Sequence, residues 1–121
     1  MKILIIDDKK SPLGIFKNEN IDFDPTLDEI LLTKNALDGI EALRKNKIDL
    51  CLIDFHLNDG FDGSFVIEFL KNNSEFLPTV TFSISADLIE RNNMDEQLKE
   101  IYKTENKPNS LIKLFENLNR N

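Results

Sequence analysis

Two short aliphatic runs that end in acidic residues limit the folds open to this chain more than any other feature. Residues 2–7 are almost entirely branched and aliphatic before Asp7, and residues 48–55 repeat the pattern before Asp54. Runs of this kind, without polar alternation, are typical of strands buried on both faces of a parallel sheet that end at a polar rim. Residues 29–33 and 79–85 are two further β-prone stretches.

Helical patterns separate these strands. Apolar side chains fall on one face in residues 36–43, 66–70 and 111–118. Alternation of strands and helices predicts right-handed crossovers, with ligands bound at the carboxyl ends of the strands. The sequence therefore predicts the α/β class, as an open five-stranded parallel sheet with helices on both faces, in a single domain over residues 1–121.

Three segments fit this scheme less well. Residues 11–27 should hold the first helix, but prolines, a glycine and a polar run leave room only for a short helix and a long loop. Residues 87–100 have a weak helical pattern, which we expect to be interrupted near Asn92 and Asn93. The fifth strand, at residues 101–106, is assigned by its position more than by its pattern.

Composition excludes several classes of function. A formal net charge of −7 argues against direct nucleic-acid binding, which needs clustered cations to neutralise phosphates. The apolar runs are too short to span a membrane, and Met1 and Lys2 lead directly into a strand without a signal peptide, so we expect a cytoplasmic protein. Cys51, the single cysteine, lies within an apolar run and is expected to be an inert buried thiol.

Polar side chains gather where the expected strands end. Asp7 and Asp8 follow the first strand, Asp54 ends the third, Ser85 ends the fourth and Lys107 follows the fifth. Carboxylates that converge repel each other unless a cation lies among them, and an all-oxygen site suits Mg²⁺, with Mn²⁺ as an alternative. A hydroxyl and an ammonium beside that metal would hold a tetrahedral anion, so the sequence predicts a phosphoryl site.

These residues resemble a known family. The pairs Asp7-Asp8, Ser85-Ala86 and Lys107-Pro108, together with Asp54 after Leu-Ile, are similar in order and spacing to the motifs of response-regulator receiver domains. The resemblance covers nearly the whole chain and implies the flavodoxin-like (βα)5 receiver fold. Each motif is weak alone, but four in register are specific.

The resemblance implies a role for each residue of the expected site. Asp54 would be the phosphoacceptor. The metal ligands would be Asp8, Asp54 and the backbone carbonyl of His56, with Asp7 in support. Ser85 and Lys107 would bind the phosphoryl group. Pro108 would follow a cis peptide bond, and His56 and Asp87 would tune dephosphorylation. His56 alone also fits a catalytic base or a phosphohistidine, but a single histidine in a polar loop is more often a bystander.

Two features depart from simple patterns. Residues 58–63 are similar to a calcium-binding loop but lack its terminal glutamate, which favours a turn. Thr104 stands where receivers commonly carry a switching aromatic residue. Tyr102 would share a strand face with Thr104 and is a candidate to replace that aromatic, although a purely structural role for Tyr102 is the simpler interpretation.

The predicted function is a relay. A phosphoryl group would pass from a histidine kinase or a histidine phosphotransferase to Asp54, and the modified domain would switch a surface read by a downstream protein or a covalently linked output domain. We expect no enzymatic activity beyond slow self-dephosphorylation. The alternatives are a Mg²⁺-dependent phosphatase or phosphotransferase with Asp54 as nucleophile, and a pseudo-receiver that is never phosphorylated.

Overall fold

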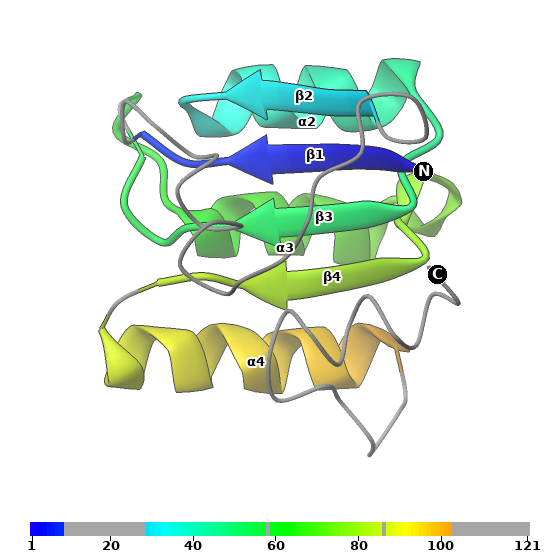
Figure 1. The fold of residues 1–121 in the computed structure, drawn as a ribbon. Helices are drawn as coiled ribbons and strands as arrows, with labels where there is room; N and C mark the ends of the chain where they lie inside the picture. The colour runs from blue at the N-terminus through cyan, green and yellow to red at the C-terminus, as the bar shows by residue number, and fades with distance from the viewer. Residues whose placement is uncertain (9–28, 58, 86, 103–121) are drawn as a thin grey trace.

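The described part of the sheet has four parallel strands, all ending at the same edge. The computed structural model describes residues 1–8, 29–57, 59–85 and 87–102. In these residues the strand order is β2-β1-β3-β4, and the four arrowheads point the same way (Figure 1). The strands are β1 (Lys2–Ile6), β2 (Glu29–Thr33), β3 (Leu50–Ile53) and β4 (Val80–Ser83). Each lies where the sequence predicts a strand.

Three helices of the described part pack against one face of this sheet. They are α2 (Ala36–Lys45), α3 (Gly63–Asn72) and α4 (Leu88–Tyr102), and a short 3-10 turn, η1 (Ser74–Phe76), follows α3. Helix α4 runs alongside β4 (Figure 1). Side chains from all three helices join one apolar core with the sheet, including Leu4, Cys51, Leu43, Val66 and Met94.

The opposite face of the sheet is buried as well. Ile3 and Ile5 of β1 and Leu50 and Leu52 of β3 are fully buried in a second apolar cluster. Because strand side chains alternate between faces, both faces of these central strands are covered. The α/β class with a doubly covered parallel sheet is confirmed. The helices expected at residues 11–27 and 111–118 lie outside the described residues.

Helix α4 corrects two expectations. It continues through Asn92 and Asn93, where we expected an interruption, because both side chains point to solvent. Exposed asparagines cost a helix less than about 1 kcal/mol each. The helix also includes residues 101 and 102, so the fifth strand cannot begin at residue 101; residues 103–106 lie outside the described part. Burial of Met94 and Leu98 against the core holds the helix in place.

Among the described residues, no helix is both long enough and apolar enough to cross a membrane.

Candidate functional site

Three carboxylates meet at the carboxyl edge of the sheet. Asp7 and Asp8 follow β1 directly, and Asp54 follows β3. The register pairs Ile6 with Ile53, and the Asp54 N–H donates to the Ile6 carbonyl at 2.8 Å, so the ends of β1 and β3 are level. One carboxylate oxygen from each aspartate lies within 4.8 Å of the others.

Burial makes this cluster costly without a cation. Asp7 and Asp54 are 2% and 5% exposed, and Asp8 is half-buried. Like charges at such separations repel strongly where water is largely excluded. Hard carboxylate oxygens are the donors that Mg²⁺ and Mn²⁺ prefer, and both ions retain waters when proteins supply few ligands. The residues present fit a divalent metal ion.

The loop after β3 is packed tightly around the candidate acceptor. The Asp54 carboxylate accepts the Phe55 N–H at 2.8 Å, and the Phe55 carbonyl accepts the Gly63 N–H at 2.8 Å. A Cβ at Gly63 would collide with the Asp54 carbonyl oxygen and lie 2.6 Å from Cε of Met94. Only glycine therefore lets the start of α3 approach the backbone of Asp54 this closely.

The turn interpretation of residues 58–63 is confirmed for the part that the structure describes. Gly60 has a φ of 82°, in the region that favours glycine. Asp59 accepts the backbone N–H groups of Ala36 at 3.3 Å and Leu37 at 3.0 Å, so it caps the first turn of α2. Although desolvation raises the pKa of Asp59, hydrogen bonds from Leu37, Ala36 and Phe61 lower it below its usual value.

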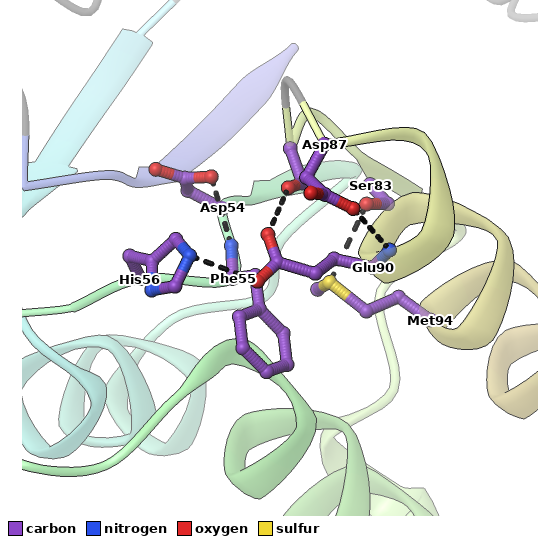
Figure 2. Close-up of polar contacts among 8 residues, drawn as sticks. Asp54, Phe55, His56, Ser83, Asp87, Glu90 and Met94 are labelled. Atoms are coloured by element: carbon purple, nitrogen blue, oxygen red, sulfur yellow. Dashed lines mark hydrogen bonds and ion pairs between the residues drawn. The ribbon is translucent and has the colours of Figure 1, made fainter.

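Ser85 lies at this edge, and its hydroxyl is bound by Glu90, a residue that the sequence did not assign to the site. The buried Ser85 Oγ donates to Oε1 of Glu90 at 3.1 Å. Nε2 of His56 lies 2.8 Å from the other oxygen, Oε2, of Glu90. Figure 2 shows Glu90 beside His56, with Asp54 and Phe55 on the adjoining loop.

A sequence signal for Glu90 existed. Asp87 and Glu90 have the spacing of a capping box, in which the side chain at the third helical position bonds back to the N-cap backbone. Asp87 does cap α4, accepting the Glu90 N–H at 3.0 Å. The Glu90 side chain instead turns to Ser85 and His56. His56, expected to offer its backbone carbonyl to the metal and to tune dephosphorylation, has a side-chain partner in Glu90.

Tyr102 lies far from the position that we expected. It is the last residue of α4, so its predicted place on a strand is wrong. Its hydroxyl hydrogen-bonds Oγ1 of Thr81 at 2.6 Å and donates to the Pro78 carbonyl at 2.8 Å, beside the amino end of β4. The acidic cluster is at the opposite end of the strands. The other expected site residues, Thr104, Lys107 and Pro108, lie outside the described residues.

Comparisons with known proteins agree with this arrangement. No protein-family model and no curated protein matches the sequence. Among solved structures, the receiver domain of the Francisella response regulator 1452 is similar at 21% identity and a TM-score of 0.60, over 81% of this chain and 75% of that one. The Mn²⁺-bound form of response regulator Rcp1 is similar at 17% identity and a TM-score of 0.63, over 95% and 86%.

A third similar structure is the MaeR response regulator bound to beryllium trifluoride, at 21% identity and a TM-score of 0.54, over 99% of this chain and 95% of that one. Because these identities are low, the similarity shows the fold alone. The acidic cluster at the edge of the sheet is established by the positions of Asp7, Asp8 and Asp54 in this chain. The chain has the fold of the response-regulator receiver domains.

Proposed function

We propose that this chain is a phosphoryl-accepting receiver of a two-component signalling system, with Asp54 as the acceptor. The observation that carries the proposal is the convergence of Asp7, Asp8 and Asp54 within 4.8 Å at the carboxyl edge of a receiver fold. Ligands of open α/β sheets bind at this edge. The buried hydroxyl of Ser85, at the end of the neighbouring strand, supplies a hydrogen-bond donor there.

The chemistry requires little beyond alignment and charge neutralisation. A carboxylate oxygen of Asp54 would attack the phosphorus of a phosphohistidine, forming an O–P bond as the N–P bond breaks and its electron pair returns to the donor imidazole. Such transfers pass through a loose transition state, with charge spread over the equatorial oxygens. A Mg²⁺ or Mn²⁺ ion held by Asp7, Asp8 and Asp54 would neutralise part of that charge. From the sequence, Lys107 would neutralise more.

The partners follow from this chemistry. The donor would be a histidine kinase or a histidine phosphotransferase, and the phosphorylated state would be read by a downstream protein or a linked output domain. The proposal includes no enzymatic role beyond slow self-dephosphorylation, and it places the protein in the cytoplasm. Two similar structures, Rcp1 and MaeR, are bound to Mn²⁺ and to beryllium trifluoride respectively, which suggests suitable probes for this protein.

Labelling with acetyl phosphate and Mg²⁺, followed by intact mass, tests the proposal. We expect one lasting phosphoryl group on the native chain and none on Asp54→Asn, because the amide is not nucleophilic. Glu68→Gln, which removes an exposed charge from α3, should label like the native chain. Rapid multiple turnover would indicate an enzyme, absence of any adduct a pseudo-receiver, and full labelling of Asp54→Asn a different acceptor.

A further inference from the structure

We propose that Glu90 is a positioning residue that holds the Ser85 hydroxyl away from Asp54 and must release it before Asp54 can keep a phosphoryl group. The inference rests on the proposed receiver function and adds a residue that the sequence motifs do not assign. Glu90 acts through Ser85, whose hydroxyl it binds.

Both oxygens of the Glu90 carboxylate are occupied. Oε1 accepts the Ser85 hydroxyl at 3.1 Å, and Oε2 lies 2.8 Å from Nε2 of His56. Ser85 is on the segment that follows β4, and His56 is two residues past Asp54 on the loop that follows β3. One side chain therefore joins the two segments that flank the candidate acceptor, as Figure 2 illustrates for His56.

Helix α4 holds Ser85 at a second point. Nε of Arg91, the residue after Glu90, donates to the Ser85 carbonyl at 2.9 Å. Consecutive residues of α4 thus bind the hydroxyl and the backbone of the same serine. Glu90 is in the first turn of α4, where the helix dipole favours a negative charge. Its side chain is only 22% exposed, so competition from water for these bonds is limited.

This arrangement opposes phosphorylation in two ways. The Ser85 hydroxyl has one proton to donate, so it cannot serve Glu90 and a phosphoryl oxygen together. Hydrogen bonds to a charged acceptor are also stronger than those between neutral groups, which favours the Glu90 partner before phosphorylation. Glu90 should therefore weaken binding of a phosphoryl group at Asp54.

The probe is beryllofluoride with Mg²⁺, which mimics a phosphoryl group on the acceptor and forms no permanent bond. Glu90→Gln keeps the size of the side chain and removes its charge, and it should bind the probe about tenfold more tightly because a hydrogen bond to a charged group is lost. Glu96→Gln, on the exposed side of the same helix, makes the same change in net charge and should bind like the native chain. Glu90→Asp keeps the charge but shortens the reach to Ser85, and it should also bind more tightly.

A double-mutant cycle separates action through Ser85 from general electrostatics. Adding Glu90→Gln to Ser85→Ala should change the affinity by less than about twofold, since the hydroxyl that Glu90 restrains is gone. Equal affinity of Glu90→Gln and Glu96→Gln would overturn the inference, and so would a full gain in the Ser85→Ala background. If no folded variant, the native chain included, binds the probe, then the receiver proposal itself fails and takes this inference with it.

Discussion

At the scale of residues, the most constrained feature is the crowding of three carboxylates in a poorly hydrated place. Asp7 and Asp54 are almost fully buried, and Asp8 is half-buried beside them. Each loses favourable hydration on folding and gains like-charged neighbours. The site therefore costs folding stability when no cation is bound.

Asp8→Ala should reverse that cost. We expect the free energy of unfolding of the metal-free protein to rise by about 1 kcal/mol, because the substitution removes one of three crowded like charges. Added Mg²⁺ should then stabilise the variant far less than it stabilises the native chain. Urea unfolding with and without MgCl₂ measures both effects. Glu68→Gln is the control for net charge; an unchanged response of Asp8→Ala to Mg²⁺ would place the metal elsewhere.

Two glycines near the site offer a matched pair of substitutions. Gly63→Ala should lower the free energy of unfolding by about 1–3 kcal/mol, because its methyl group overlaps the Asp54 carbonyl. It should also weaken beryllofluoride binding by displacing that backbone. Gly60→Ala meets no atoms within 4 Å and should cost about 1 kcal/mol through its positive φ alone, without loss of binding. Equal effects of the two substitutions on binding would contradict this account.

The residues that the sequence placed correctly are those fixed by the ends of strands. Asp7, Asp8 and Asp54 follow buried aliphatic runs, and a parallel sheet brings such positions to one edge whatever the side chains do. The side chain of Glu90, in the first turn of α4, can turn either to the N-cap backbone or to Ser85 and His56. Periodicity carries no information on which direction it takes, so only the packed structure reveals the contacts of Glu90.

At the scale of elements, α4 is tied to the amino end of β4 through Tyr102. Tyr102→Phe removes the hydroxyl that hydrogen-bonds Thr81 and Pro78, and it leaves the buried Thr81 hydroxyl without this partner. We expect a loss of about 1–2 kcal/mol in the free energy of unfolding. Beryllofluoride affinity should stay unchanged, because these contacts lie at the end of the sheet opposite Asp54. A large change in affinity would support the switching role considered for Tyr102.

The same contact should make stability fall in alkaline solution. Burial raises the pKa of Tyr102 above its ordinary value, although the hydrogen bond from Thr81 opposes the shift. The contribution of Tyr102 to the free energy of unfolding is therefore complete below the ordinary tyrosine pKa of about 10. It is lost as pH rises from there towards the pKa of Tyr102 in the folded protein. Tyr102 is the only tyrosine, so absorbance of the phenolate reports its ionisation directly. Titration with an ordinary pKa in the folded protein would contradict the burial.

The sequence predicts the elements with a strong period accurately, and it predicts α4, which has a thin apolar stripe, only in part. The four described strands, α2 and α3 have dense apolar patterns, and all lie where the sequence indicates. Helix α4 buries little more than Met94 and Leu98, so its pattern is faint and its end was mistaken for a strand. Packing against α3 and β4, which a single sequence does not display, extends this helix to Tyr102.

At the scale of the whole molecule, one thiol reports opening of the core. Cys51 is fully buried in the central strand β3, and burial raises its pKa, so both access and ionisation limit its reactivity. An aromatic disulfide reagent should label it only when the sheet opens, at a rate that rises with urea in parallel with unfolding. Labelling that ignores urea would show that Cys51 is reached without opening of the sheet.

Mg²⁺ should slow the labelling of Cys51, although the metal site lies at the edge of the sheet. A ligand that binds only the folded state stabilises it by about 1.4 kcal/mol at ten times its dissociation constant, which corresponds to roughly tenfold slower labelling. Asp8→Ala should show no such protection. The comparison relates the acidic edge to the stability of the whole domain in a single assay.

The two hydrogen bonds between α4 and Ser85 have a thermodynamic consequence. Because Glu90 and Arg91 bind the same serine, the position of the start of α4 and the occupancy of Asp54 become linked equilibria. Coupling of this kind is reciprocal. A molecule that binds α4 more tightly when Ser85 is released raises the affinity for a phosphoryl group at Asp54. Phosphorylation of Asp54 raises the affinity for that molecule by the same factor. A partner that binds α4 would then help to determine how readily Asp54 accepts a phosphoryl group.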